Sequence, residues 1–142
     1  MKRGKHLNKK ILILCTGNSC RSIIAEAIIN AKVDGVTAYS SGVAPSGKVN
    51  ENAKKVLKNN GVWKDKYHSK HLDKLSKIKF DLVITVCDNA YETCPVFSKP
   101  IEKIHIGFVD PDGKEFEAFE KTYKDIENIL LPKVLKVFNL AI

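Results

Sequence analysis

The amino-acid sequence predicts an α/β fold: one domain of three layers, α/β/α, in which a four-stranded parallel sheet lies between helices. The main observation is that short apolar segments alternate along the chain with segments whose apolar residues recur at helical spacing. Parallel strands are joined by helical crossovers, so this alternation indicates a parallel sheet covered on both faces. The second observation is size, because 142 residues with 44% hydrophobic content suit one sizeable core rather than two domains.

Each element has its own signal in the sequence. Four apolar segments are the predicted strands: residues 10–15, 36–41, 80–86 and 103–106. The third strand, FDLVITV, has the strongest signal because it combines apolar and β-branched residues. Four segments are the predicted helices: residues 21–33, 50–59, 71–78 and a last one from residue 114. Pro132 falls inside the last helical pattern, where it either kinks the helix or starts a new one.

The loop between the first strand and the first helix, residues 15–22 with the sequence CTGNSCRS, is predicted to bind a tetrahedral oxyanion. A loop that opens a helix directs several backbone N–H groups at one point, where the helix dipole adds partial positive charge. Gly17 and Asn18 are residue types that tolerate the positive φ that such a tight loop requires. The predicted anion-binding residues are Thr16, Gly17, Asn18, Ser19, Cys20, Arg21 and Ser22, and Cys20 is assigned no essential role of its own.

Cys15 is the predicted nucleophile, and Arg21, six positions later, is predicted to hold two oxygens of the anion. The loop N–H groups and the Arg21 charge favour a thiolate, so we expect the Cys15 pKa to fall from about 8.5 into the range of roughly 3.5–7.5. Ser22 is expected to donate a hydrogen bond to the Cys15 sulfur. The alternative is a buried cysteine that ends a strand, with a solvated arginine on the helix.

Asp110, which follows the fourth predicted strand and precedes Pro111, is the candidate general acid. The loop after that strand lies on the same rim of the predicted sheet as Cys15. When a thiolate attacks an oxyanion, the departing oxygen leaves more readily once a nearby carboxylic acid has protonated it. The alternative is that Asp110 and Pro111 simply begin a turn before the last helix.

Two further cysteines belong to the same rim. Cys87 ends the third predicted strand, and Cys94 follows after a segment that either forms a short helix or rearranges to join the two thiols. Three cysteines at one rim favour redox relay chemistry, and two buried, inert cysteines are the alternative. The spacings of the four cysteines and the scattered histidines do not fit a zinc site, so we predict no metal-ligating cluster.

The formal charge of the chain is +8, and five of the positive residues lie among the first ten. We expect residues 1–10 to form a basic tail and residues 11–142 a single catalytic domain. No RNA-binding aromatic signature or DNA-binding helix pair accompanies the tail, so no nucleic-acid partner is expected. No stretch approaches the ~20 apolar residues of a membrane span, and the apolar run before Cys15 is shorter than the ~7–15 residues of a signal peptide. We therefore expect no membrane partner and a cytoplasmic location.

Together these motifs resemble the thioredoxin-coupled arsenate reductases, which are built on the low-molecular-weight protein tyrosine phosphatase fold. The resemblance extends from Ile11 to about Phe138. Its main carriers are CTGNSCRS at 15–22, Tyr39-Ser40 with Gly42, DLVITVC at 81–87, Cys94-Pro95 and HIGFVDP at 105–111. The family has two branches, the arsenate reductases and the phosphatases, which share the oxyanion loop. A phosphatase, however, does not need Cys87 and Cys94. Related phosphatases usually carry a tyrosine where this chain has Asp112, which also favours the reductase.

The resemblance implies a mechanism for arsenic detoxification. Cys15 attacks arsenate while Asp110 protonates the departing water. Cys87 then attacks the Cys15 sulfur, which releases arsenite and leaves a Cys15–Cys87 disulfide. Cys94 attacks Cys87 in turn, and thioredoxin or a similar thiol donor reduces the resulting Cys87–Cys94 disulfide. The last exchange requires the segment between these two cysteines to loosen, so low local stability of residues 88–94 is expected.

Two other functions are compatible with the loop. A low-molecular-weight protein tyrosine phosphatase would need Cys15, Arg21 and Asp110 but would tolerate the loss of Cys87 and Cys94. A non-enzymatic oxyanion or thiol sensor would bind the anion without turnover and would not depend on Asp110. Phosphate and sulfate share the shape and charge of arsenate, so we expect them to act as analogues and expect a weak phosphatase side activity.

The resemblance implies no required cofactor. Some members of the family bind a potassium ion near the loop, and Asn18, Glu26 and Ser41 match part of that site, while its remaining carboxylate ligand has no match around residues 70–71. Ile23, Ile106, Val109 and the pair Asn50-Glu51 also depart from the family pattern, but no departure changes a proposed catalytic residue. We expect the protein to be a monomer.

Overall fold

A four-stranded parallel sheet forms the centre of the computed structural model, which describes residues 8–88 and 101–140. Its strands are β1 (Lys9–Cys15), β2 (Val36–Gly42), β3 (Leu82–Thr85) and β4 (Glu102–His105). They lie in the order β2-β1-β3-β4, and every neighbouring pair is parallel. The predicted α/β fold is therefore confirmed. The strand β1 begins at Lys9, so Lys9 and Lys10 of the expected tail belong to the sheet.

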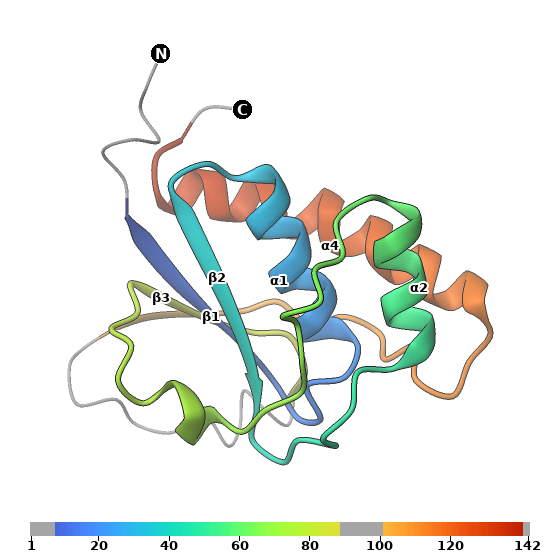
Figure 1. Cartoon of the computed structure of the whole chain (residues 1–142). Coiled ribbons are helices and arrows are strands. Elements are labelled where there is room, and N and C mark those ends of the chain that lie inside the picture. Colours follow the sequence, from blue (N-terminus) through green and yellow to red (C-terminus); the bar gives the residue numbers. More distant parts are fainter. Residues whose placement is uncertain (1–7, 89–100, 141–142) are drawn as a thin grey trace.

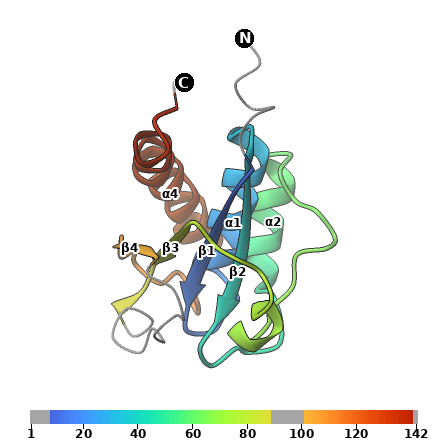
Figure 2. The same ribbon diagram turned by 90° about the vertical axis from the view of Figure 1, so that its left-hand side faces the viewer.

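In the part of the chain that the structure describes, three helices cover one face of the sheet: α1 (Arg21–Lys32), α2 (Glu51–Asn59) and α4 (Phe116–Val137). Figures 1 and 2 show them together on the same side of the strands, whereas the segment that carries the short 3₁₀ helix η2 (Leu72–Leu75) lies on the other side. The sheet is thus the middle one of three layers. The predicted helical segment at 71–78 is shorter than expected, because only η2 is regular.

Local sequence signals explain where the helices begin and how far they run. The side chain of Asn50 caps α2 by accepting hydrogen bonds from the N–H groups of Asn52 at 2.8 Å and Ala53 at 3.4 Å. The helix α4 continues as one element through Pro132, which resolves the choice between a kinked helix and a new one in favour of a single helix. Pro132 removes one N–H from the helical ladder, and the apolar stripe of α4 still packs on the sheet.

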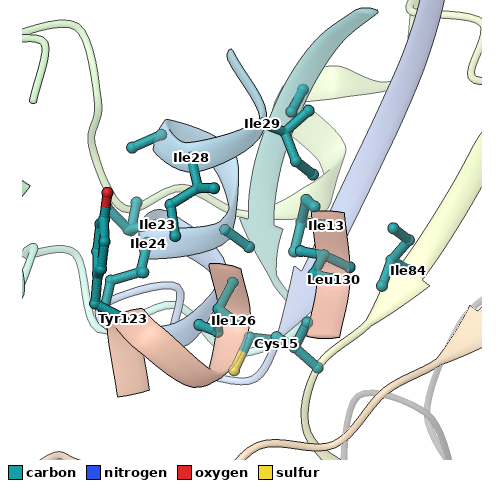
Figure 3. Close-up of a cluster of buried hydrophobic side chains, with 14 of the residues drawn as sticks. Ile13, Cys15, Ile23, Ile24, Ile28, Ile29, Ile84, Tyr123, Ile126 and Leu130 are labelled. Carbon is teal, nitrogen blue, oxygen red and sulfur yellow. The ribbon is translucent and has the colours of Figure 1, made fainter. Parts of the chain in front are cut away.

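The central strand β1 is buried on both faces. Ile11 and Ile13 pack in the larger apolar cluster, with α1 and α4, while Leu12 packs with the smaller cluster on the η2 side. Figure 3 shows side chains of α1 and α4 meeting Ile13 and Ile84 of the sheet, and Cys15 belongs to the same cluster. The core therefore extends up to the carboxyl end of β1. It fixes the position of the residue that starts the oxyanion loop.

The parallel register brings the carboxyl ends of three strands to one rim. Cys15 stands opposite Gly42 of β2, and Leu14 stands opposite Thr85 of β3. Ligands bind at this rim in open α/β sheets. No helix within residues 8–88 and 101–140 is long and apolar enough to cross a membrane.

Candidate active site

The loop that follows β1 is held from outside by hydrogen bonds to its carbonyl groups. The N–H groups of Val43, Ala44, Ser46 and Asn50 donate to the carbonyls of Cys15, Thr16, Gly17 and Ser19, respectively, at 2.9 to 3.1 Å. In a planar trans peptide the N–H points away from the C=O, so the N–H groups that follow these carbonyls face the opposite side. That side adjoins the N-terminus of α1, which begins at Arg21. The backbone thus forms the predicted anion-binding arrangement.

Asn18 shapes this loop from within. It has a positive φ of 50° and is fully buried. Its amide nitrogen donates to Ser22 Oγ at 2.8 Å and to Ser40 Oγ at 3.0 Å, and its amide oxygen accepts from the Lys70 N–H at 2.8 Å. The prediction of a positive φ is confirmed for Asn18 and wrong for Gly17, because Gly17 does not adopt one.

Gly42 has a steric role that the sequence analysis missed. A Cβ atom at this position would lie 2.4 Å from the carbonyl oxygen of Thr16 and 3.1 Å from the Asn18 Cβ. No real Cβ approaches a backbone oxygen so closely, so β2 must end in glycine for the loop to pack against it. A Cβ at Gly17 would meet its nearest neighbour, Ser19 Oγ, at 3.7 Å, which is an ordinary contact.

Cys15 and Cys87 meet at the base of the loop. Both cysteines are buried, and Thr16 Oγ1 lies 3.2 Å from Cys87 Sγ, within hydrogen-bond distance. The hydrogen bond with Cys87 is the largest cause that raises the pKa of Cys15, followed by burial. The Arg21 charge and the Thr16 N–H lower it but do not outweigh the neighbouring thiol. The expectation of a lowered Cys15 pKa is therefore wrong for the reduced protein, since two adjacent thiols resist carrying two negative charges.

Arg21 joins the oxyanion loop to the segment that carries the candidate general acid. Its Nη1 donates to the carbonyl of Phe108 at 3.0 Å, and its Nη2 lies 3.4 Å from Asp110 Oδ2. Its Nε is one of two buried side-chain polar atoms without a hydrogen-bond partner among the described residues. The structure therefore brings Arg21 and Asp110 together, on the rim where the sequence places Asp110 and the oxyanion loop. The Nε remains available to donate to a bound oxyanion.

The other predicted residues have simpler outcomes. Burial raises the pKa of Cys20 to about 11, so this thiol stays protonated at neutral pH, and its assignment to no essential role stays a prediction. Ser22 Oγ accepts from Asn18, and its hydrogen bond to the Cys15 sulfur stays a prediction. Cys94 lies outside the described residues.

A buried polar network lies beneath the loop. The Ser40 hydroxyl donates to Glu26 Oε1 at 2.5 Å, and burial raises the pKa of Glu26. The Lys70 ammonium group opposes this shift through its charge, and burial lowers the pKa of Lys70 itself. Ser69 also supports the loop, because its hydroxyl donates to the Gly17 carbonyl at 3.1 Å. The sequence analysis missed Ser69 and Lys70, which have no local motif.

The residues that resemble a potassium site fit such an ion in part. Glu26 offers a buried carboxylate, and Ser41 Oγ is buried without a hydrogen-bond partner among the described residues. The amide of Asn18, in contrast, is already engaged on both sides by Ser22, Ser40 and Lys70. Within residues 8–88 and 101–140, no group of three or more His, Cys, Asp or Glu residues is placed to hold a metal ion.

A polar cleft of about 450 Å³ adjoins the oxyanion loop. Its lining residues are Ser19, Ser46, Lys48, Val49, Asn50, Glu51, Asn52 and Asp112. Asn50 Nδ2 donates to Asp112 Oδ1 at 2.9 Å across this cleft. None of the described residues that line the cleft is aromatic.

The site has the features of one class of α/β proteins, which bind an oxyanion and attack it with a thiol. These features are a cysteine at the end of a parallel strand, a loop whose backbone N–H groups face inward, and an arginine at the N-terminus of the following helix. The family model described as "Low molecular weight phosphotyrosine protein phosphatase" matches residues 10–137. The chain therefore belongs to the low molecular weight phosphotyrosine protein phosphatase family, and the expected resemblance is confirmed at that level.

Similar proteins come from both branches of this family. Arsenate reductase 1 of Staphylococcus epidermidis is 37% identical over 120 residues, which cover 84% of this chain and 90% of the relative. The crystal structure of arsenate reductase from Archaeoglobus fulgidus has a TM-score of 0.76 and 29% identity, over 87% of this chain and 98% of that chain. The low molecular weight protein tyrosine phosphatase from T. tengcongensis has a TM-score of 0.74 and 26% identity, over 90% of this chain and 98% of that chain.

The first prediction concerns the glycine at the end of β2. Gly42→Ala should destabilise the protein by roughly 1–3 kcal/mol and abolish phosphate binding, because the added methyl group displaces the Thr16 carbonyl. Gly17→Ala is the matched control and should change the free energy of unfolding by less than about 1 kcal/mol. Urea unfolding and calorimetric titration with phosphate measure both effects. Equal behaviour of the two variants would contradict the steric role of Gly42.

The second prediction concerns the Cys15 pKa. Cys87→Ala removes the largest cause that raises it, so Cys15 should lose its proton at lower pH than in the wild type. At a fixed pH below the wild-type pKa, a larger fraction of Cys15 is then thiolate and reacts faster with iodoacetamide. The pH profile of Cys15 alkylation, read by mass spectrometry, tests this. A profile that moves to higher pH would show that Cys87 instead stabilises the thiolate.

Proposed function

We propose that this protein is an arsenate reductase that converts arsenate to arsenite through a three-cysteine relay. The observation that carries the proposal is the contact between Cys87 and Cys15, in which a second thiol lies against the nucleophile. A phosphatase needs only the first thiol, because water completes its reaction. A reductase needs the second thiol, because this thiol attacks the sulfur of the first and so releases the arsenic as arsenite. The arsenate reductase names of the similar proteins support the same proposal.

In the proposed first step, the Cys15 thiolate attacks arsenic(V), and an arsenate oxygen leaves as water with a proton from Asp110. Cys87, as a thiolate, then attacks the Cys15 sulfur, and the electron pair of the S–As bond stays with arsenic. Arsenic(V) becomes arsenic(III), while two thiols become one disulfide, so two electrons are transferred. Cys94 next attacks Cys87 and frees Cys15 as a thiol. A dithiol donor, thioredoxin or a similar protein, reduces the Cys87–Cys94 disulfide.

The arrangement around Arg21 suits this first step. A tetrahedral anion in the loop supplies an acceptor for the buried Arg21 Nε. Asp110 already lies near the same guanidinium, on the side that is partly open to solvent. The general acid and the anion-binding arginine thus act on one bound oxyanion.

The cleft beside the loop favours a small inorganic substrate over a phosphotyrosine peptide. Asp112 lines it, at the position where related phosphatases usually carry a tyrosine for holding an aromatic substrate. Carboxylate and amide groups replace the aromatic surface that a phenyl ring would stack on. Phosphate and sulfate are expected to occupy the loop as analogues of arsenate.

We place this reaction in the cytoplasm, because a relay of free thiols needs a compartment that keeps cysteines reduced. We propose that the protein acts as a monomer. Residues 89–94 lie outside the described residues, and their expected rearrangement in the last exchange stays a prediction.

The decisive experiment is a single turnover of the fully reduced protein with arsenate and no added reductant. Thiols that remain are alkylated, and the disulfide is mapped by mass spectrometry. The expected products are an equimolar amount of arsenite and a Cys87–Cys94 disulfide, and Cys87→Ser should abolish both. If all thiols stay free while Cys15-dependent hydrolysis of phosphate esters persists in Cys87→Ser, the protein is a tyrosine phosphatase instead.

A potassium ion is not required in this proposal. Glu26 and Ser41, beside the loop at Asn18, are the residues that would hold it, and it would compensate the charge of the buried carboxylate. The Lys70 ammonium group already acts on Glu26 in this way. Replacing potassium by choline at constant ionic strength should therefore leave the single-turnover rate unchanged within about twofold. A larger loss of rate, restored by potassium alone, would contradict this.

A further inference from the structure

A histidine–aspartate pair that the proposed mechanism does not use lies directly beside Cys87. His105, the last residue of β4, has its Nε2 2.9 Å from Asp88 Oδ1 and its Nδ1 2.8 Å from Thr85 Oγ1. The imidazole thus bridges the end of β3 and the residue that follows Cys87. Each ring nitrogen has a partner, one on β3 and the other three residues beyond its end, so the orientation of the ring is fixed.

The backbone around this bridge is paired as well. The Ile106 N–H donates to the Thr85 carbonyl at 2.9 Å, and the Phe108 N–H donates to the Val86 carbonyl at 3.2 Å. The two segments that follow β3 and β4 therefore stay side by side beyond the ends of these strands. Cys87 lies between Val86, held through its carbonyl, and Asp88, held through its side chain.

Gly107, two residues after His105, runs close to the pair. A Cβ atom at this position would lie 3.4 Å from His105 Nε2 and 3.5 Å from Asp88 Oδ1, which are ordinary van der Waals contacts. The backbone after β4 therefore passes next to the pair.

The position of Cys87 matters because thiol–disulfide exchange requires the attacking sulfur to approach the other sulfur in the correct direction. In this structure the Cys87 sulfur contacts Thr16 Oγ1 on one side and is the hydrogen-bond partner of Cys15. The Asp88 side chain is 87% exposed, so its pair with His105 adds little to global stability. The contact is local: it ties the residue after Cys87 to the end of β4.

We propose that His105 is a positioning residue that acts through Asp88 to hold Cys87 against Cys15 in the reduced protein. The inference rests on the proposed function, in which Cys87 attacks the Cys15 sulfur. His105 and Asp88 contact neither the oxyanion nor the reacting sulfurs. Their loss should therefore slow formation of the Cys15–Cys87 disulfide and leave binding of the anion unchanged.

The test uses the full chain with Cys94→Ser, so that the first disulfide persists. Diamide is the oxidant: it takes two electrons and two protons from the Cys15 and Cys87 thiols and leaves a disulfide, without any arsenate. The rate of Cys15–Cys87 cross-linking is followed by quenching and mass spectrometry. Asp88→Ala and His105→Ala should each slow the cross-linking rate by roughly 3- to 10-fold. The effect is limited because an exposed ion pair contributes only a modest free energy to holding Cys87 in place.

Three controls separate positioning from general damage. Asp88→Asn keeps an acceptor for His105 Nε2 and should cross-link within about twofold of the wild-type rate. The double variant Asp88→Ala with His105→Ala should be no slower than either single variant, because the two residues act as one unit. The affinity for inorganic phosphate, measured by calorimetry, and the melting temperature should stay close to the wild-type values in all variants.

Wild-type cross-linking rates in both alanine variants would overturn the inference. So would an Asp88→Asn variant as slow as Asp88→Ala, or a loss of phosphate affinity that parallels the loss of rate. Failure of the proposed function is a separate result, because it would appear as the absence of arsenite and disulfide in the single turnover with arsenate. The diamide rates do not depend on that outcome.

Discussion

The backbone hydrogen bonds between residues 43–50 and the carbonyls of the oxyanion loop are the constraint on which the site depends. Each bond fixes a carbonyl on the outer side of the loop, so the following N–H groups face inward at the N-terminus of α1. A loop free to rotate its peptides would present a mixture of donors and acceptors to an anion. Because the donors come from the segment just after β2, the pairing of β1 with β2 is also part of the site.

The polar side chains of Asn18 and Glu26 are costly to bury, and the structure compensates both of them. Asn18 uses both ends of its amide, and Glu26 receives the Ser40 hydroxyl and the charge of Lys70. Such a network holds the loop in one conformation, since any other conformation leaves a buried polar group unpaired. The same principle explains why Gly42 is required: the loop lies so close to β2 that no side chain fits between them.

The sequence was informative where one segment carries its own signal. The strands, the loop that opens α1 and the positive φ of Asn18 follow from local pattern, and the shared rim of a parallel sheet places Asp110 on the side of the oxyanion loop. The contacts of Ser69 and Lys70 with the loop could not be predicted, because they join residues more than fifty positions apart without a motif. The Cys15 pKa was predicted with the wrong sign because the loop motif contains the groups that lower it, whereas Cys87 comes from another strand.

The hydrogen bonds that shape the loop come from backbone atoms of residues 43–50, whereas the side chains of Ser46, Lys48 and Asn50 line the neighbouring cleft. Catalytic geometry and substrate recognition therefore draw on different atoms of the same segment. Side chains that hold no backbone group in place, such as that of Lys48 and unlike that of Asn50, which caps α2, can diverge without disturbing the oxyanion loop. Such a division makes the scaffold evolvable, since new substrate preferences can arise on an unchanged chemical centre. It also marks the cleft-lining positions Lys48, Val49, Glu51 and Asn52 as those where a protein engineer would diversify specificity first.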